Sequence, residues 1–352
     1  MAYSTIPKGS LYMNPKIYTG NGSTNNITGV GFQPDWVWTK CRSTVNSSRL
    51  IDAVRGVTKA IVSNSSGAEF TEANGLSAFG TDGYTLNGNL ASMNTNSDTY
   101  VSWNWKANGA GSANTDGGIN STVSANTTSG FSIVSYDGNG SNGSSVGHGL
   151  GAVPQMLITK RLNSADPWIV QQHEITTGNP WDDLYVVLDT DAGRAGTLSV
   201  SGGYAPNANE FYVGNASAVN GSTSSYITYC FTGKQGFSKF GGYIGNGNAD
   251  GTFVYTGFSP SFIMIKRTDG AANWELYDSK RLGYNSSNPP LYPDLNNAEG
   301  GNGRVDILSN GFKIVTTSGN LGAAGGTYIY MAFAENPFVA TSGTSAIPVT
   351  AR

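Results

Sequence analysis

The stretch Tyr243–Gly247 reads YIGNG, and closely similar pentapeptides stand at Tyr18–Gly22 (YTGNG) and Tyr136–Gly140 (YDGNG). Asn-Gly between apolar segments is a strong signal for a tight β-hairpin, because both residues accept a positive φ. The pentapeptide therefore predicts a strand that ends in a hairpin turn. Its recurrence predicts that one local structure is built three times.

A second landmark follows each pentapeptide, a proline that opens an apolar run closed by a lysine. The runs are PDWVWTK, PQMLITK and PSFIMIK, and the proline-to-lysine separation is six residues each time. Proline cannot donate to a ladder, so we expect it at the first position of a strand. The apolar run predicts burial on both faces, and the lysine is expected to mark the return to solvent. The signature residues of the repeat are Tyr18, Gly20, Asn21, Gly22, Pro34, Lys40, Tyr136, Gly138, Asn139, Gly140, Pro154, Lys160, Tyr243, Gly245, Asn246, Gly247, Pro260 and Lys266.

Each copy closes with two more predicted strands, the first led by an aromatic residue and the second by a tyrosine 15 or 16 residues later. The second strands are YVSWNW, YITYCF and YIYMAF. YVSWNW and YIYMAF alternate, which predicts one packed face and one wetter face. Four landmarks in one order predict a triplicated unit. The leading residues are Tyr84, Phe211 and Phe312 for the first strand and Tyr100, Tyr226 and Tyr328 for the second.

We therefore predict an all-β chain of three tandem, divergent domains, each a β-sandwich or jelly roll. The segment Ser48–Ile61 is compatible with a short helix or a strand pair, and we favour strands. The predicted divisions are an N-terminal arm 1–15, domains at 16–108, 130–235 and 236–339, a Gly/Ser/Asn/Thr-rich linker 109–129 and a C-terminal arm 340–352.

The composition agrees with many short strands joined by tight turns. Gly accounts for 48 of 352 residues, and charged residues for 12%, against roughly 25% in typical domains. The net charge of −3 gives no electrostatic footprint for nucleic acid. No apolar stretch approaches the roughly 20 residues needed for membrane insertion, and the first residues do not resemble a secretory signal. Cys41 and Cys230 alone cannot form a disulfide framework.

Candidate catalytic and metal-binding residues are few. His148 has no histidine counterpart in the other copies, and His173 has Glu174 and Asp182 as potential partners without a nearby nucleophile motif. The stretch Asp189–Arg194 (DTDAGR) resembles the start of a calcium loop but lacks the later acidic ligands. We predict no catalytic residues, no cofactor and no metal.

Paired carboxylates for glycoside hydrolysis are the enzymatic alternative, and such a pair would have to lie roughly 5–10 Å apart. No acidic signature recurs among the copies, so we predict that the protein is not an enzyme. The candidate carboxylates are Asp182, Asp183, Asp189, Glu210, Asp278 and Glu299.

Two further patterns recur in only two copies. An Asp-x-x-Arg pair stands at Asp52/Arg55 and Asp278/Arg281, while the second copy has Gln172 and Ile175 there. We interpret it as a structural ion pair. Tryptophan stands eight residues after the lysine in the second and third copies, where the first copy has serine. Core packing is the interpretation that we favour, and an exposed platform for sugar stacking is the alternative. These residues are Trp168, Trp274 and Ser48.

Several segments resemble a family of virion structural proteins of marine phages, including phages of cyanobacteria and of pelagic heterotrophs. The matching segments include ITGVGFQPDWVWTKCR, RLIDAVRG, GLSAFGTDGYTL, VGHGLGAVPQMLITKR, KFGGYIGNGNADGTFVYTGFSPSFIMIKR and GGTYIYMAFAENPF, and they span nearly the whole chain. The resemblance implies an exterior component of the particle, of the kind labelled tail fibre or host-attachment protein. It carries over no catalytic residue.

Three functions are open from the sequence. The first is a tail-associated exterior protein that binds a host receptor or glycan through its loops. The second is a capsid decoration or head-fibre protein, and the third is a glycan-cleaving enzyme. The expected partners are other virion proteins and further copies of the chain, because virion exteriors are symmetric and the edge strands of sandwiches need covering. A homotrimer is preferred from fibre-like precedents. The expected location is the virion exterior, after assembly in the host cytoplasm.

Overall fold

The computed structural model describes residues 4–175, 181–281, 285, 288–301, 303–337, 339–342 and 345–348. The described chain is nearly all β, which confirms the predicted fold class. Its helical elements are the 3₁₀ turn η1 (Gly9–Leu11) and the one-turn helix α1 (Ser217–Asn220). The segment Ser48–Ile61 forms the strands β4 (Arg49–Asp52) and β5 (Lys59–Ala60), as expected.

Three antiparallel sheets share one strand order, and each belongs to one sequence repeat. In each sheet the strand that contains the signature tyrosine lies beside the last strand of the unit. That last strand lies in turn beside the strand that contains the signature lysine. We name unit 1 from β1 to β9, unit 2 from β10 to β18 and unit 3 from β19 to β25. The four strands that the sheets share are β1 (Met13–Thr19), β9 (Thr99–Trp105), β3 (Trp36–Cys41) and β4 in unit 1; β12 (Phe131–Asp137), β18 (Ser225–Phe231), β14 (Met156–Arg161) and β15 (Ile169–Gln172) in unit 2; and β19 (Ser238–Ile244), β25 (Thr327–Pro337), β21 (Phe258–Arg267) and β22 (Glu275–Asp278) in unit 3. The sheet of unit 2 continues beyond these four to seven strands.

A smaller second sheet packs on each main sheet, so each unit is a two-layer sandwich. Residues between these layers form separate apolar clusters in units 1 and 2. The smaller sheets are β2 (Asn25–Thr28), β8 (Gly83–Leu86) and β7 (Leu76–Gly80); β13 (Ser144–Gly147) and β17 (Glu210–Val213); and β20 (Phe253–Tyr255), β24 (Gly311–Ile314) and β23 (Val305–Leu308).

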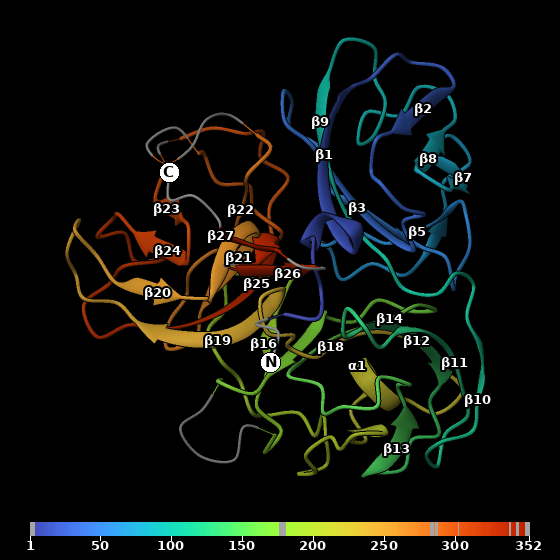
Figure 1. The fold of residues 1–352 in the computed structure, drawn as a ribbon. Coiled ribbons are helices and arrows are strands. Elements are labelled where there is room, and N and C mark those ends of the chain that lie inside the picture. The colour runs from blue at the N-terminus through green and yellow to red at the C-terminus, as the bar shows by residue number, and fades with distance from the viewer. Residues whose placement is uncertain are drawn as a thin grey trace.

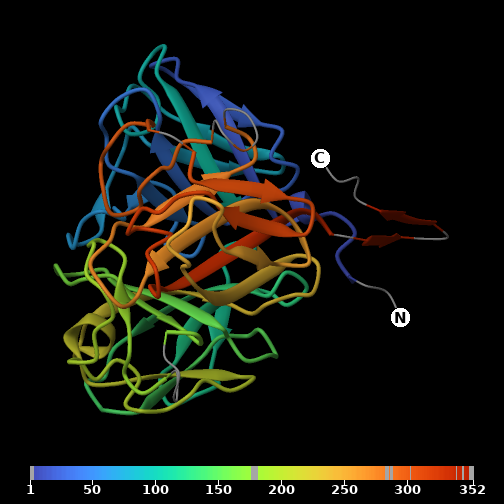
Figure 2. The same cartoon turned by 90° about the vertical axis from the view of Figure 1, so that its left-hand side faces the viewer.

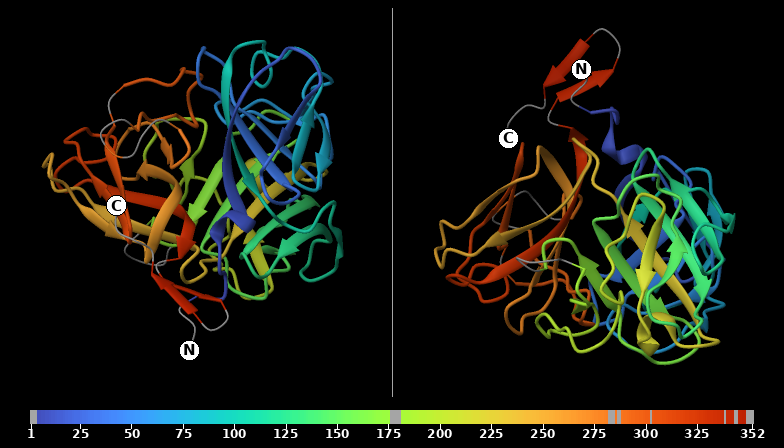
Figure 3. Two further views of the ribbon diagram at one scale, coloured as in Figure 1. Left: turned by 45° about the horizontal axis from the view of Figure 1, so that its top comes forward. Right: turned by 90° about the horizontal axis from the view of Figure 1, so that it is seen from below.

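The other faces of the three main sheets meet in one shared core, with the units arranged around it as three lobes (Figures 1 and 3). Trp105, Phe231 and Phe333 hold the same position in β9, β18 and β25. The ring centroids of Trp105 and Phe333 lie 5.9 Å apart, and those of Phe231 and Phe333 lie 6.0 Å apart. The units therefore bury their inner faces against one another.

This shared core explains why the predicted alternation of the closing strands is wrong. Every residue of β9 after Thr99 is buried, and the same holds for β18 after Ser225. One face of these strands packs on the unit's own second sheet and the other on the neighbouring units. A wetter face was expected because one repeat in isolation gives no sign of its neighbours.

The pentapeptide does not form the predicted hairpin. In unit 1, β1 pairs with β9 and β2 pairs with β8, so Tyr18–Gly22 connects the two layers of a sandwich. Asn21 Oδ1 accepts a hydrogen bond from the Ser23 amide at 2.9 Å, and only Gly22, at φ 68°, has a positive φ. Asn139 and Asn246 make the same local turn, and Gly140 and Gly247 have the same φ sign.

Each signature tyrosine lies against the leading tyrosine of the last strand. The centroids of Tyr18 and Tyr100 are 5.2 Å apart, and the Tyr18 hydroxyl donates to the Met93 carbonyl at 2.8 Å. The Tyr100 hydroxyl donates to the Ala91 carbonyl and accepts from the Thr95 amide. Units 2 and 3 repeat every one of these bonds at the same spacing, through Tyr136 with Tyr226 and Tyr243 with Tyr328.

The terminal and linker segments carry more structure than the sequence predicts. The predicted linker 109–129 contains β10 (Ser112–Asn114) and β11 (Ser121–Asn126), and β11 pairs along β12. The predicted N-terminal arm contributes Ile6 and Met13 to the core. In the predicted C-terminal arm, β26 (Val339–Ser342) and β27 (Ser345–Pro348) form a hairpin that projects from the body (Figure 2).

We expect Gly20→Ala to destabilise the protein by at least about 2 kcal/mol. A Cβ at residue 20 would lie 2.2 Å from the Thr95 carbonyl oxygen, so the backbone would have to move. Gly138 and Gly245 face equivalent carbonyls at 2.5 and 2.3 Å. Gly300→Ala is the matched control, because no atom lies within 4 Å of its added Cβ. Urea unfolding measures both variants, and equal midpoints would contradict this account.

Candidate functional site

The three signature lysines are buried rather than exposed, so the predicted return to solvent is wrong. Lys40, Lys160 and Lys266 have at most 1% of their surface exposed. Each Nζ donates to a carbonyl six residues later in its own unit and to a carbonyl of a neighbouring unit. The acceptors are Asn46 (2.8 Å) and Leu295 (2.7 Å) for Lys40, Asp166 (2.8 Å) and Ser66 (2.9 Å) for Lys160, and Ala272 (2.5 Å) and Asp191 (2.8 Å) for Lys266.

These bonds close a ring. Unit 1 bonds to unit 3, unit 3 bonds to unit 2, and unit 2 bonds to unit 1. Backbone bonds follow the same cycle, each accepted by the carbonyl two residues after the lysine. They are Glu69 N to Leu162 O, Arg194 N to Thr268 O and Glu299 N to Arg42 O. The three units are therefore related by a cyclic pseudo-symmetry.

Burial lowers the pKa of each of the three lysines to about 8. The low-polarity surroundings disfavour the ammonium form, and nearby carboxylates only partly compensate. Asp294 is one such carboxylate, and burial raises its own pKa to about 7. The three lysines are thus structural groups whose charged form is disfavoured by burial.

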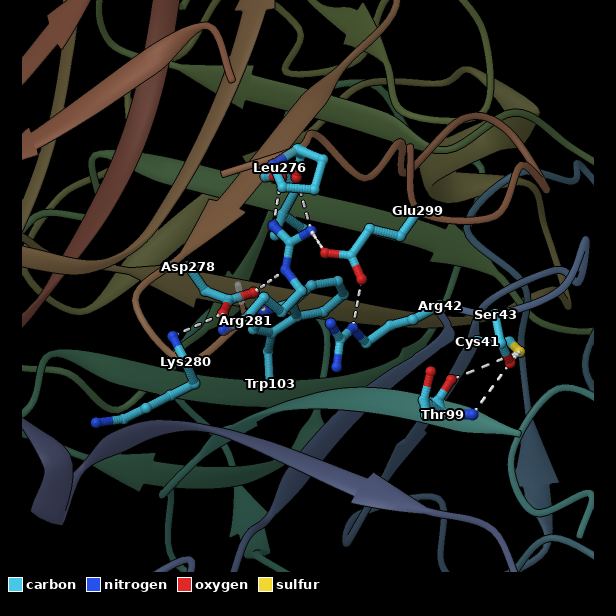
Figure 4. Close-up of polar contacts among 11 residues, drawn as sticks. Cys41, Arg42, Ser43, Thr99, Trp103, Leu276, Asp278, Lys280, Arg281 and Glu299 are labelled. Carbon is cyan, nitrogen blue, oxygen red and sulfur yellow. Dashed lines mark hydrogen bonds and ion pairs between the residues drawn. The ribbon is translucent and has the colours of Figure 1, made fainter. Parts of the chain in front are cut away.

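A second polar network crosses from unit 3 to unit 1 (Figure 4). Asp278 Oδ2 accepts a hydrogen bond from Arg281 Nε at 2.6 Å and another from Trp103 Nε1 at 3.1 Å. Glu299 lies between two arginines, 3.1 Å from Arg281 Nη1 and 2.5 Å from Arg42 Nε. The Asp278–Arg281 pair has no exposed side-chain surface, so it is the structural ion pair that we interpreted from the sequence.

Unit 1 repeats this arrangement against unit 2. Asp52 Oδ2 lies 2.6 Å from Arg55 Nε and accepts from the Tyr229 hydroxyl at 2.8 Å. Tyr229 and Trp103 occupy the same position in β18 and β9. Unit 3 has Met331 there, which has no donor for a carboxylate, and unit 2 accordingly carries Gln172 in place of the aspartate. Gln172 Nε2 instead donates to the Gly241 carbonyl at 3.1 Å.

The two equivalent tryptophans also join neighbouring units. Trp168 Nε1 donates to the Val62 carbonyl of unit 1 at 2.9 Å, and Trp274 Nε1 donates to the Val187 carbonyl of unit 2 at 2.8 Å. Both side chains are buried, so they pack in the core and are not exposed sugar-stacking platforms.

The carboxylates considered for glycoside hydrolysis mostly make structural contacts. Asp183 accepts from the Ser201 and Gly202 amides, and Asp189 accepts from the Trp168 amide. Glu210 contacts Asn207. Asp182 lies at the surface. Asp278 and Glu299 lie close together, because both contact Arg281 in the network of Figure 4.

His148 is held inside unit 2. Its Nε2 donates to the Asn207 carbonyl and its Nδ1 accepts from the Leu150 amide, while burial lowers its pKa. Cys41 and Cys230 are free and buried. Across the described ranges, no three His, Cys, Asp or Glu side chains gather as metal ligands. None of the helices in those ranges is long and apolar enough to cross a membrane.

Two surface clefts lie at equivalent junctions between units. The 2/3 cleft, of about 620 Å³, lies between the His173–Glu174 turn of unit 2 and strands β19 and β20 of unit 3. The 3/1 cleft, of about 400 Å³, lies between Lys280 of unit 3 and strand β1 of unit 1. His173 Nε2 donates to the Phe240 carbonyl at 2.9 Å, and Glu174 Oε1 is 3.6 Å from His173 Nδ1. Sequence reasoning noted this His–Glu pair but did not place it at a junction.

We expect Arg281→Met to lower the free energy of unfolding by about 3–5 kcal/mol, because it leaves the Asp278 carboxylate buried without its partner. Arg267→Met is the control. Arg267 Nε lies 2.7 Å from Asp269 Oδ1, almost the same distance, but both side chains are partly exposed. An exposed pair contributes at most about 1 kcal/mol. Urea unfolding compares the variants, and equal losses would contradict the structural role of burial.

We expect stability to rise between pH 8 and 9. A lysine whose folded pKa is about 8 loses its proton in the native state first, while the unfolded chain keeps it up to its ordinary value of 10.5. The unfolded state then binds more protons, and each lysine adds up to about 1.4 kcal/mol per pH unit, a slope approached only once the folded lysine has lost its proton. Lys160→Met should make the rise about one third smaller in urea unfolding. A rise unchanged by the substitution would show that other groups cause it.

Comparison of the sequence with known protein families gives a match. A family model described as a domain of unknown function, DUF7483, matches residues 8–337. Searches of curated proteins and of solved structures give no match. The matched range includes all three units and every signature residue, and the chain therefore belongs to the DUF7483 family.

Proposed function

We propose that the protein is a structural component of the exterior of a bacteriophage particle, associated with the tail and contributing to host attachment. The resemblance of segments from all three units to marine-phage virion proteins supports the phage assignment. The observation that carries the structural role is the closed ring of three units. Its buried lysines, ion pairs and tryptophans serve to fix the units relative to one another.

A rigid ring suits a protein whose surface has to be presented in one orientation. The segment from residue 4 to η1 and the hairpin of β26 and β27 leave the body on the same side (Figure 2). A Cβ on Gly9 would lie 2.1 Å from the Ala334 carbonyl oxygen, so the N-terminal segment lies directly against the end of β25. This side is the natural attachment side, which leaves the loops of the three units free to face outward.

Capsid decoration is the second candidate, and the pseudo-symmetry favours it specifically. One chain offers three related lobes around an axis, so a single copy matches a threefold position of a shell without further copies. The homotrimer expected from the sequence stays a prediction. The engaged carboxylates give no support to the glycan-cleaving alternative, and we propose no catalytic role for them.

A cryo-electron microscopy map of the intact phage that encodes this chain tests the proposal. We expect density for the three-lobed body on the tail, with the side bearing the chain ends turned toward the particle. The same density on the head would replace the first candidate with capsid decoration. Particles that contain none of the protein by mass spectrometry would contradict both.

A further inference from the structure

At each of the three junctions, the same edge strand of a main sheet lies next to the neighbouring unit. What lies beside this edge strand differs from one junction to the next. The edge strands are β1, β12 and β19, which align through their signature tyrosines Tyr18, Tyr136 and Tyr243. Beside β12, the place is filled by β11, which pairs with it from Phe131 to Tyr136. Beside β1 and β19 lie the 3/1 cleft and the 2/3 cleft.

Neither open cleft is suited to a further strand. Proline stands in β1 at residue 15, where β12 has Ile133, and proline offers no amide for a ladder. Along β19, the Phe240 carbonyl is occupied by His173 Nε2 and the Gly241 carbonyl by Gln172 Nε2. The side chains of unit 2 thus cap the edge that a strand would need. The clefts therefore remain as surface concavities that no strand of the described chain fills.

The 2/3 cleft combines an aromatic wall with polar groups of both charges. Tyr255 is 52% exposed, and Lys239 Nζ lies 5.4 Å from its ring centroid. Glu174 keeps half of its side-chain surface in solvent. Its carboxylate approaches His173 only at 3.6 Å, which is beyond hydrogen-bond distance and leaves its acceptor capacity available.

Two glycines form the base of the same cleft. An added Cβ at Gly241 would meet the Tyr330 hydroxyl at 2.7 Å, so only glycine lets the Tyr330 ring lie across the strand. A side chain at Gly242 would start 3.4 Å from Glu174 Cβ and fill the cleft. Gly242 is exposed, and its backbone is within reach of a ligand. The 3/1 cleft has Lys16 and Ile17 at these two positions and no aromatic lining residue.

We propose that the 2/3 cleft is a saccharide-binding site, in which Tyr255 stacks against a sugar ring and Glu174 and Lys239 bond its hydroxyl groups. The negative face of an aromatic ring attracts the polarised C–H groups of a sugar. A carboxylate accepts and an ammonium donates, so together they match hydroxyl groups, which do both. This inference rests on the proposed role in host attachment, and it names the class of receptor that such a protein would contact.

Saturation-transfer NMR on the full chain tests the site, with maltohexaose, cellohexaose, chitohexaose and hexagalacturonate as probes. A peptide with the sequence of β11, Ser121–Asn126, serves as the strand-shaped competitor. The variants are Tyr255→Ala and Glu174→Gln, which alter exposed side chains and should leave the thermal midpoint unchanged. Lys16→Ala, in the 3/1 cleft, is the matched control.

We expect at least one hexasaccharide to receive saturation, with an affinity reduced about tenfold or more by Tyr255→Ala and by Glu174→Gln but unchanged by Lys16→Ala. The proposal is overturned if none of the four sugars receives saturation, if Lys16→Ala weakens binding instead, or if only the β11 peptide binds. If the sugar-binding test fails, the proposed location on the particle still stands, because the electron microscopy map tests it separately. A chain absent from the particle that still binds a sugar through Tyr255 would overturn the proposed function and not the site.

Discussion

Ring closure by the three buried lysines is the constraint on which the rest of the structure depends. Each ammonium is removed from water and its pKa falls to about 8, so burying the charge is itself unfavourable. The lysine instead fixes the relative placement of two units. The N–H groups of its Nζ find acceptors only where a carbonyl of the neighbouring unit lies at hydrogen-bond distance. We infer that these lysines specify the relative placement of the units, while the shared aromatic core contributes most of the stability.

Much of the fold could be predicted from spacing alone, because the repeat imposes the same strand order three times. The strands led by Tyr84, Phe211 and Phe312 lie where the sequence places them. The YxGNG pentapeptide was misread as a hairpin because Asn-Gly identifies a turn and not the strands that it joins. Its first glycine is required by a carbonyl about 2.2–2.5 Å from the missing Cβ, and this carbonyl belongs to a residue 75 to 83 positions later in the chain.

The site could be predicted only in part, and for a physical reason. Lysine at the end of an apolar strand normally reaches solvent, and a single unit gives no sign that a neighbour's carbonyls replace the water. The fixed position of Lys40, Lys160 and Lys266 in three otherwise divergent copies was the available signal, because a solvent-facing lysine has no reason to keep its place. The 2/3 cleft is formed by residues from two units, so no local pattern contains it.

The departures from the repeat are as informative as the repeat itself. Unit 2 lacks the Asp-x-x-Arg pair where its neighbour has Met331, which offers no cross-unit donor of the kind that Trp103 and Tyr229 supply to Asp278 and Asp52. Gln172 and the adjacent His173 turn instead to the carbonyls of β19. The loss of an ion pair and the capping of a sheet edge are therefore one change. At this junction the residues that stand in place of the ion pair contact the edge strand of the next unit, which is how a repeated scaffold can acquire one distinctive junction.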